Sequence, residues 1–152
     1  MSYSIEVVDL KPQPVLIMEA KVAPEGLGEA LAELLPTVHG YVAAQGGDMS
    51  GMPFLRYLSM SDEWHIAAGV PVAEALPGTD EIIATELPGG PTATTLFLGP
   101  YQEVGTAWDA LFAWCGERGR SHSQGGWDVY ENDPTEVANP TELRTRIYQP
   151  LD

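Results

Sequence analysis

Cysteine is almost missing from this chain of 152 residues, in which Cys115 is the single example. A disulfide within the chain needs two cysteines, and a cysteine-based metal cluster needs several, so both are excluded. Cys115 lies on an apolar helical pattern. We therefore expect it to be a buried packing residue.

Positive charge is also scarce, with 7 lysines and arginines against 22 aspartates and glutamates, and the formal net charge is −15. A surface of this sign repels phosphate backbones and anionic lipids. We therefore expect no direct nucleic-acid binding and no membrane association. The acidic balance either keeps the protein in solution or attracts cationic partners at long range.

Long apolar runs are absent, since no stretch approaches the roughly 20 residues of a membrane span. The opening "MSYSIEVVDLKP" lacks the basic-then-apolar layout of a signal peptide. These features predict a cytoplasmic protein. The length suits a single domain over residues 1–152 with a sizeable core.

Motifs for metals, cofactors and hydrolytic catalysis are missing as well. The sequence contains no GxSxG, no GxGxxG and no phosphate-cradling glycine loop, and "PGGP" indicates a turn. His39, His65 and His122 lack the spacing of metal ligands. We expect no metal and no cofactor, and the chain shows no DNA-binding helical module of its own.

An internal repeat is what the sequence does contain. "DLKPQPVLIMEAKVAP" and "TELPGGPTATTLFLGPY" each place prolines ahead of an apolar run, which is typical of the start of a strand. A helical pattern follows each run, and Pro36 is expected to kink the first helix or end it early. The apolar positions are Leu27, Leu31, Leu34, Leu35 and Val38 in the first helix, and Val104, Trp108, Leu111, Phe112 and Cys115 in the second.

Two short strand candidates follow each helix. They are "PFLRYLS" and "EWHIAAGVPV" in the first half, and "GWDVYEN" and "ELRTRIYQPL" in the second. Aligning the halves matches Phe54 with Trp127, Tyr57 with Tyr130, and Pro71 with Pro150. The sequence therefore predicts an α+β fold of duplicated β-α-β-β units, about residues 1–78 and 79–152. Its antiparallel-rich sheet carries two helices on one face.

Alternation along the strands predicts which side chains turn away from the helices. Trp127 and Val129 are expected to face the helices, and Trp108 is expected to be a core residue. The opposite face is expected to form a ligand groove between the two units, or else an ordinary solvated sheet face. Its expected lining is Leu55, Tyr57, His65, Asp128, Tyr130, Arg144, Arg146 and Tyr148.

Four segments resemble the GyrI-like effector-binding domain, which occurs alone and as the ligand-sensing half of AraC- and MerR-type regulators. They are "GVPV", "FLGPYQEV", "WDVYENDP" and "ELRTRIYQPL", in this order. The resemblance covers essentially the whole chain. It implies pseudo-twofold β-α-β-β units and a groove for bulky, often cationic or aromatic compounds, as in multidrug binding. Some stand-alone members hydrolyse cyclopropane-bearing natural toxins.

The chain departs from the pattern that this resemblance implies. Asp128 stands where the family often has a glutamate, and Arg146 and Ala67 stand where it often has acids. Asp128, Arg144 and Arg146 would give the groove a net charge of +1, which favours a neutral or anionic aromatic ligand. Alternatively, Arg146 and Asp128 pair with each other across adjacent strands.

Three functions follow as hypotheses. The first is a stand-alone protein that senses or sequesters a bulky hydrophobic or aromatic small molecule. The second is a hydrolase of strained, cyclopropane-type toxins, in which Asp128 would be the catalytic acid or base. The third is a protein-binding inhibitor of a larger partner such as DNA gyrase.

Overall fold

The computed structural model describes residues 3–132 and 135–152, and it divides into two compact units. Unit 2 is the continuous segment Pro12–Pro88. Unit 1 combines Met1–Lys11 with Gly89–Asp152. Asp133 and Pro134, the end of the "WDVYENDP" segment, lie outside the described residues.

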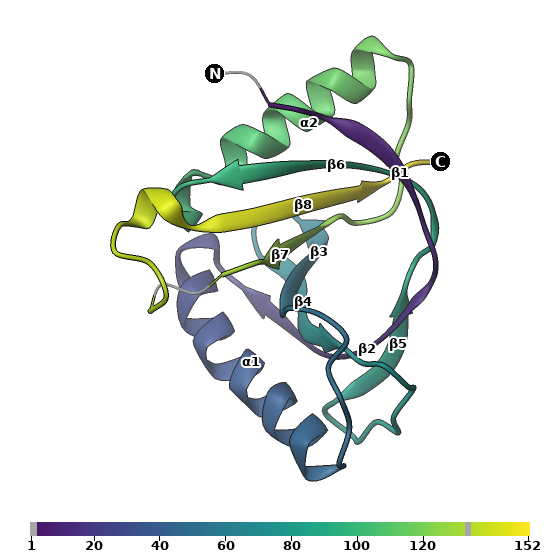
Figure 1. Cartoon of the computed structure of the whole chain (residues 1–152), viewed down its shortest axis with the longest axis vertical. Helices are drawn as coiled ribbons and strands as arrows, with labels where there is room; N and C mark the ends of the chain where they lie inside the picture. The colour runs from purple at the N-terminus through teal and green to yellow at the C-terminus, as the bar shows by residue number, and fades with distance from the viewer. Residues whose placement is uncertain (1–2, 133–134) are drawn as a thin grey trace. The chain divides into compact units, whose positions relative to one another are not determined.

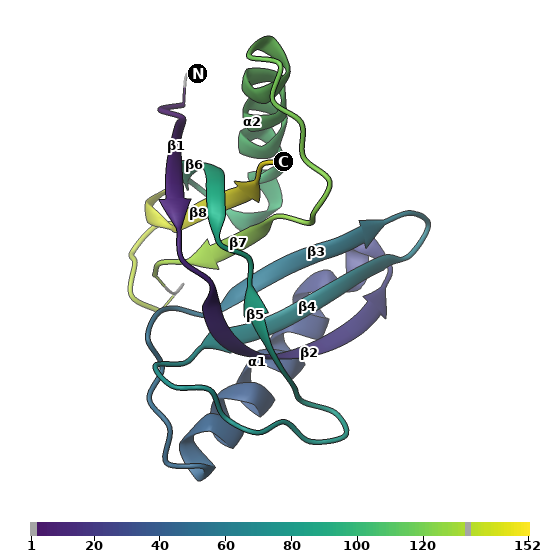
Figure 2. The ribbon, with the colours of Figure 1, turned by 90° about the vertical axis from the view of Figure 1, so that its right-hand side faces the viewer.

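Unit 2 is a four-stranded antiparallel sheet with one long helix. Its strands lie in the order β3-β4-β2-β5, and Figure 2 shows α1 along one side of β2, β3 and β4. The elements in chain order are β2 (Gln13–Val22), a 3-10 turn (Pro24–Gly26), α1 (Leu27–Ala44), β3 (Phe54–Met60), β4 (Trp64–Pro71) and β5 (Ile83–Leu87).

Unit 1 repeats this arrangement with the strand order β7-β8-β6-β1, again antiparallel throughout. Figure 1 shows α2 running beside β6 and β8. The elements are β1 (Glu6–Leu10), β6 (Gly90–Leu98), a 3-10 turn (Tyr101–Glu103), α2 (Gly105–Glu117), β7 (Trp127–Tyr130), a second 3-10 turn (Pro140–Glu142) and β8 (Arg144–Pro150). The α+β class and the duplicated β-α-β-β unit are confirmed.

The two units exchange their first strands, which the sequence analysis did not foresee. β1 precedes β2 in the chain but pairs with β6, and β5 precedes β6 but pairs with β2. The chain therefore leaves one unit for the other at residues 11–12 and 88–89. Residue 78, the expected boundary between the two repeats, lies in the segment between β4 and β5, whereas compact unit 2 extends past it to Pro88.

Each unit buries its own core between its helix and one face of its sheet. In unit 1, Leu111 and Cys115 of α2 pack on Ala93 and Ile147, and Trp108 is partly buried against them. Burial raises the pKa of the Cys115 thiol, and the nearby Arg120 and Arg118 lower it. In unit 2 the buried cluster is Leu16, Val38, Val42, Val70, Val72 and Ile82.

Pro36 does not end the first helix, contrary to one expectation from the sequence. α1 continues through Pro36 to Ala44, and Val38 and Val42 beyond the proline are buried in the core. Proline removes one backbone hydrogen bond from a helix interior. Burial of these two valines against the sheet offsets that loss, because apolar burial stabilises by about 1.5–3 kcal/mol for each such side chain.

Within residues 3–132 and 135–152, no helix is long and apolar enough to cross a lipid bilayer.

Gly69 of the "GVPV" segment has a steric reason to be glycine. A Cβ at this position would collide with the Leu16 carbonyl oxygen and would lie 2.7 Å from Ile17 Cγ2 on the neighbouring strand β2. Gly40, in contrast, lies within α1 and has no atom within 4 Å of such a Cβ.

We therefore expect Gly69→Ala to lower the free energy of unfolding by about 1–3 kcal/mol, because overpacking displaces strand β2. Gly40→Ala is the matched control, and it should raise stability by up to about 1 kcal/mol through helix propensity. Urea unfolding followed by circular dichroism measures both. Equal stability of Gly69→Ala and the parent protein would contradict the predicted close packing of β2 and β4.

Candidate functional site

Strand register shows which face of the unit 1 sheet each side chain occupies, because directly opposed residues of antiparallel strands share a face. Ile147 of β8 is fully buried in the core with α2. Its partner on β7 is Asp128, and its partner on β6 is Thr95. Asp128 therefore lies on the helix side of the sheet.

The expected orientation of Asp128, toward the face away from the helices, is thus wrong. Its side chain is 1% exposed, and the Trp108 indole Nε1 on α2 donates a hydrogen bond to Asp128 Oδ1 over 2.8 Å. A buried carboxylate is costly unless polar partners satisfy it, and the indole provides one. Trp127, which was expected to face the helices, shares the opposite face with its partner Tyr148.

Tyr130 shares the helix side with Asp128, which corrects the second expectation for this strand. Its ring meets Tyr101 edge-on, with 5.2 Å between ring centroids. Burial raises the pKa of the Tyr130 phenol well above its ordinary value, and the charges of Asp128 and Tyr101 raise it further.

The side-chain orientation predicted for β3 in unit 2 is wrong in the same way, shifted by one residue. Leu55 opposes Ala68 of β4, which in turn opposes Met18 of β2, and Met18 packs against the core under α1. Leu55 is fully buried, and Tyr57, two residues further along the strand, points to the same side of the sheet. Tyr57 contacts the Trp64 ring edge-on with 6.1 Å between centroids. Both side chains were expected on the open face, and both lie on the helix side.

The predicted orientation is correct for β4 and β8. His65, Arg144, Arg146 and Tyr148 all lie on the face away from the helix of their own unit, which we call the open face. In unit 2, His65 Nε2 lies 2.6 Å from Glu19 Oε1.

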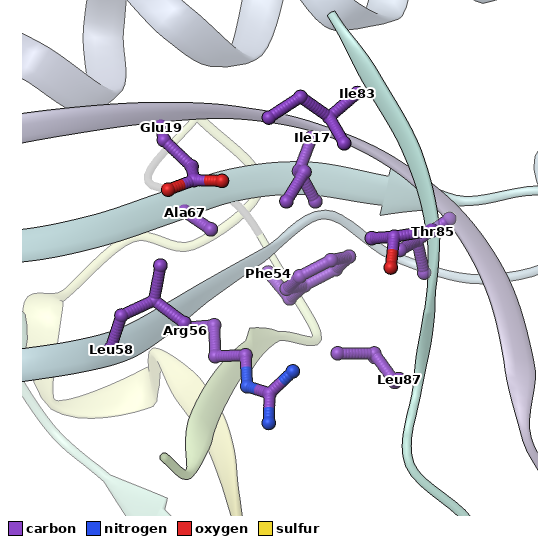
Figure 3. Close-up of a pocket in the computed structure, with 10 residues that line it drawn as sticks. Ile17, Glu19, Phe54, Arg56, Leu58, Ala67, Ile83, Thr85 and Leu87 are labelled. Carbon is purple, nitrogen blue, oxygen red and sulfur yellow. The ribbon is translucent and has the colours of Figure 1, made fainter. Parts of the chain in front are cut away.

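A pocket of about 180 Å³ occupies the open face of unit 2. Figure 3 shows the Phe54 ring among its lining side chains, with Glu19 and Arg56 on different sides of the ring. Burial lowers the pKa of the Arg56 guanidinium from its usual value. The lining residues are Val15, Ile17, Glu19, Phe54, Arg56, Leu58, Ala67, Ile83, Thr85 and Leu87.

The open face of unit 1 carries a charged cluster. Glu131 accepts from Arg146 Nε at 3.2 Å and lies 3.4 Å from Arg144 Nε. Trp127 and Tyr148 stack beside it with 5.7 Å between ring centroids. The alternative pairing of Arg146 with Asp128 is therefore wrong, because Arg146 pairs with Glu131 on its own face.

The sequence-based set missed several open-face residues, among them Phe54, Arg56 and Glu131. One signal could have found the first two. Arg56 sits inside "PFLRYLS", and a guanidinium is far less compatible with a helix-covered core than a leucine or a tyrosine is. The charge of Arg56 would have turned Phe54 to the open face and Leu55 and Tyr57 to the core.

The described residues contain no group of three or more histidine, cysteine, aspartate or glutamate side chains that could hold a metal ion. The polar chemistry of the two open faces therefore rests on guanidinium, carboxylate, imidazole and phenol groups. Such groups are chemically able to hold and orient a ligand through hydrogen bonds and charge.

Trp108→Phe tests the buried bond between Trp108 and Asp128. The change keeps an aromatic ring in the core but removes the indole donor, so we expect unfolding to become easier by about 1–3 kcal/mol. Trp114→Phe is the control, because Trp114 packs against the same core and its indole N–H donates no hydrogen bond to a described residue. Urea unfolding gives both values, and equal losses would contradict a special role for this hydrogen bond.

The raised pKa of Tyr130 predicts that the protein loses stability in alkali. A tyrosine whose pKa is raised on folding binds its proton more tightly in the folded state. The free energy of unfolding is then unaffected below the unfolded pKa of about 10 and falls above it. At pH 11 the protein should lose up to about 1.4 kcal/mol relative to Tyr130→Phe, each variant being normalised to its own stability at pH 8. Tyr3→Phe, in the same unit, is the control, and an identical pH dependence in Tyr130→Phe and the parent would overturn this expectation.

Comparison with known proteins places these features in a family. The sequence matches the GyrI-like small molecule binding domain over residues 3–152. Comparison with curated protein sequences gives no match.

Solved structures with this fold share little sequence with the chain. The crystal structure of the EcmrR C-terminal domain matches with a TM-score of 0.88 at 16% identity, over 100% of this chain and 99% of that one. EcmrR in a cryo-EM complex with DNA matches with a TM-score of 0.86 at 17% identity, over 99% of this chain and 57% of that one. This chain thus spans little more than half of that EcmrR chain.

A third structure contains a ligand. SAV2435 bound to tetraphenylphosphonium matches with a TM-score of 0.61 at 9% identity, over 100% of this chain and 94% of that one. At such identities these likenesses concern the fold alone. The family match over nearly the full length goes further, and on that basis the chain belongs to the GyrI-like small molecule binding domain family.

Proposed function

We propose that this domain senses or sequesters a bulky hydrophobic or aromatic small molecule, which it binds on an open sheet face. The pocket on the open face of unit 2 carries the proposal. It combines apolar walls, such as Phe54 and Leu87, with two charged groups, Arg56 and Glu19. Small-molecule sites have this composition, with a mostly apolar surface and a few polar groups that orient the ligand.

The size of the pocket indicates which part of a ligand it receives. A cavity of about 150 Å³ accommodates benzene, so a pocket of about 180 Å³ suits one ring of a larger molecule. Leu58 and Ile83 line it and are 37% and 38% exposed, so this part of the wall is already in contact with solvent. Burying these side chains under a ligand ring would remove apolar surface from water, which favours binding.

Catalysis by Asp128 has no support in this geometry. The carboxylate is buried on the helix side and accepts a hydrogen bond from Trp108. A general acid or base must come within hydrogen-bond reach of its substrate. Binding without turnover is therefore the function that we propose, and a bound compound should be recovered chemically unchanged after incubation with the protein.

Titration with the neutral fluorescent probe N-phenyl-1-naphthylamine tests this proposal. Leu58→Asn should weaken binding of the probe by about 1 kcal/mol, roughly fivefold, because it makes an exposed part of the apolar wall polar. Met60→Asn is the matched control, since Met60 lies on the same strand, is 57% exposed and does not line the pocket. Absence of saturable binding to the parent protein, or equal losses in the two variants, would overturn the proposal.

A further inference from the structure

The open face of unit 1 concentrates positive charge around one carboxylate. Glu131 holds both Arg144 and Arg146, at 3.4 and 3.2 Å, and each arginine uses its Nε atom for this contact. No described residue accepts a hydrogen bond from the terminal Nη groups of either arginine. The cluster thus has two positive charges, one negative charge and donors left for a further acceptor.

Apolar and aromatic side chains border this cluster on the same face. Leu98 and Leu96 of β6 directly oppose Arg144 and Arg146 of β8. Leu98 is 54% exposed and therefore accessible to a ligand. On β8, Tyr148 follows two residues after Arg146 and therefore points the same way.

The electrostatic environment of Tyr148 shows that these groups lie close together. Burial raises the pKa of the Tyr148 phenol, Arg146 lowers it and Glu131 raises it. Glu6 of β1 is another carboxylate of unit 1 whose side chain points to the open face. Glu6 opposes Thr94, so strand β6 separates it from the arginines.

We propose that the open face of unit 1 binds an organic anion, a carboxylate or sulfonate attached to an aromatic or other apolar body. Arg144 and Arg146 receive the acidic group, while Leu98, Leu96 and the edge of Tyr148 contact the apolar body. Guanidinium groups suit this task because their planar array of donors matches the oxygens of such anions. The inference goes beyond the proposed function, since it fixes the charge of a ligand and uses residues of unit 1 alone.

The acidic character of the whole chain does not prevent such binding. At physiological ionic strength, charges farther away than about 8 Å are largely screened, so the cluster acts through its local charge. A cationic ligand would meet two guanidiniums at this place, and the one carboxylate among them is already shared by both.

Two dyes with one skeleton test the inference. 1-Anilinonaphthalene-8-sulfonate carries a sulfonate that N-phenyl-1-naphthylamine lacks, so their comparison isolates the contribution of the anion. We expect Arg144→Gln and Arg146→Gln each to weaken binding of the sulfonate roughly three- to tenfold. Neither should change binding of the neutral dye. Arg118→Gln, which removes the same charge directly after the end of α2, should leave both affinities unchanged.

Glu131→Gln separates an anion site from a purely structural ion pair. Removing the carboxylate frees both guanidiniums, so binding of the sulfonate should become several-fold tighter, whereas Glu117→Gln on α2 should have no effect. Thermal melting of each variant shows that it is folded. If Glu131→Gln leaves the sulfonate affinity unchanged or lowers it in a folded protein, the inference is wrong.

The two dyes also distinguish failure of this inference from failure of the proposed function. If the neutral dye binds and responds to Leu58→Asn while the sulfonate ignores the arginine variants, only the anion site is refuted. If the neutral dye shows no saturable binding but the sulfonate responds as expected, only the proposed function is refuted. If neither dye binds, both are refuted.

Discussion

Antiparallel register, together with a helix on one face of each sheet, determines where the strand side chains of this protein point. Ile147 is an example, because its burial under α2 assigns Thr95 of β6 and Asp128 of β7 to the same side. The alternate positions, Arg146 and Tyr148, must then turn away from α2. A shift of one residue in the pairing of β7 with β8 would exchange the side chains on the two faces of that strand.

This constraint explains how far the sequence could predict the structure. The repeat, the fold class and the open-face positions on β4 and β8 followed from alternating patterns such as Leu143, Thr145 and Ile147 against Arg144, Arg146 and Tyr148. Strands β3 and β7 were misassigned because both of their faces carry large side chains. Phe54 and Trp127 are apolar and buried, yet they lie on the open faces. Tertiary contacts, and not side-chain size, decide such strands.

Asp128 was beyond prediction for a different reason. Burying a carboxylate is unfavourable unless a partner is supplied, and the partner comes from Trp108, twenty positions earlier in the sequence and on a helix. Trp108 itself reads as an ordinary core residue on an apolar stripe. The two expectations were each reasonable in isolation, and the bond between the two residues could be seen only in three dimensions.

The scarce positive charges of the chain are not spread evenly. Four of the seven basic residues lie on strands and point to an open face, namely Lys21, Arg56, Arg144 and Arg146. Of the acids within the described strands, only Glu6 and Glu19 share this orientation, and Glu131 joins them directly after β7. The open faces thus differ in charge from the remainder of the chain.

The exchange of first strands has a consequence for the order in which the protein can assemble during synthesis. All strands of unit 2 have left the ribosome once Pro88 has emerged, so this unit can complete its sheet early. Strand β1 is made first, but its partner β6 does not begin until Gly90. The nascent chain must therefore carry β1 unpaired while the whole of unit 2 is translated. The two acidic side chains of β1, Glu6 and Asp9, disfavour pairing of this unpaired strand with any sheet other than its own.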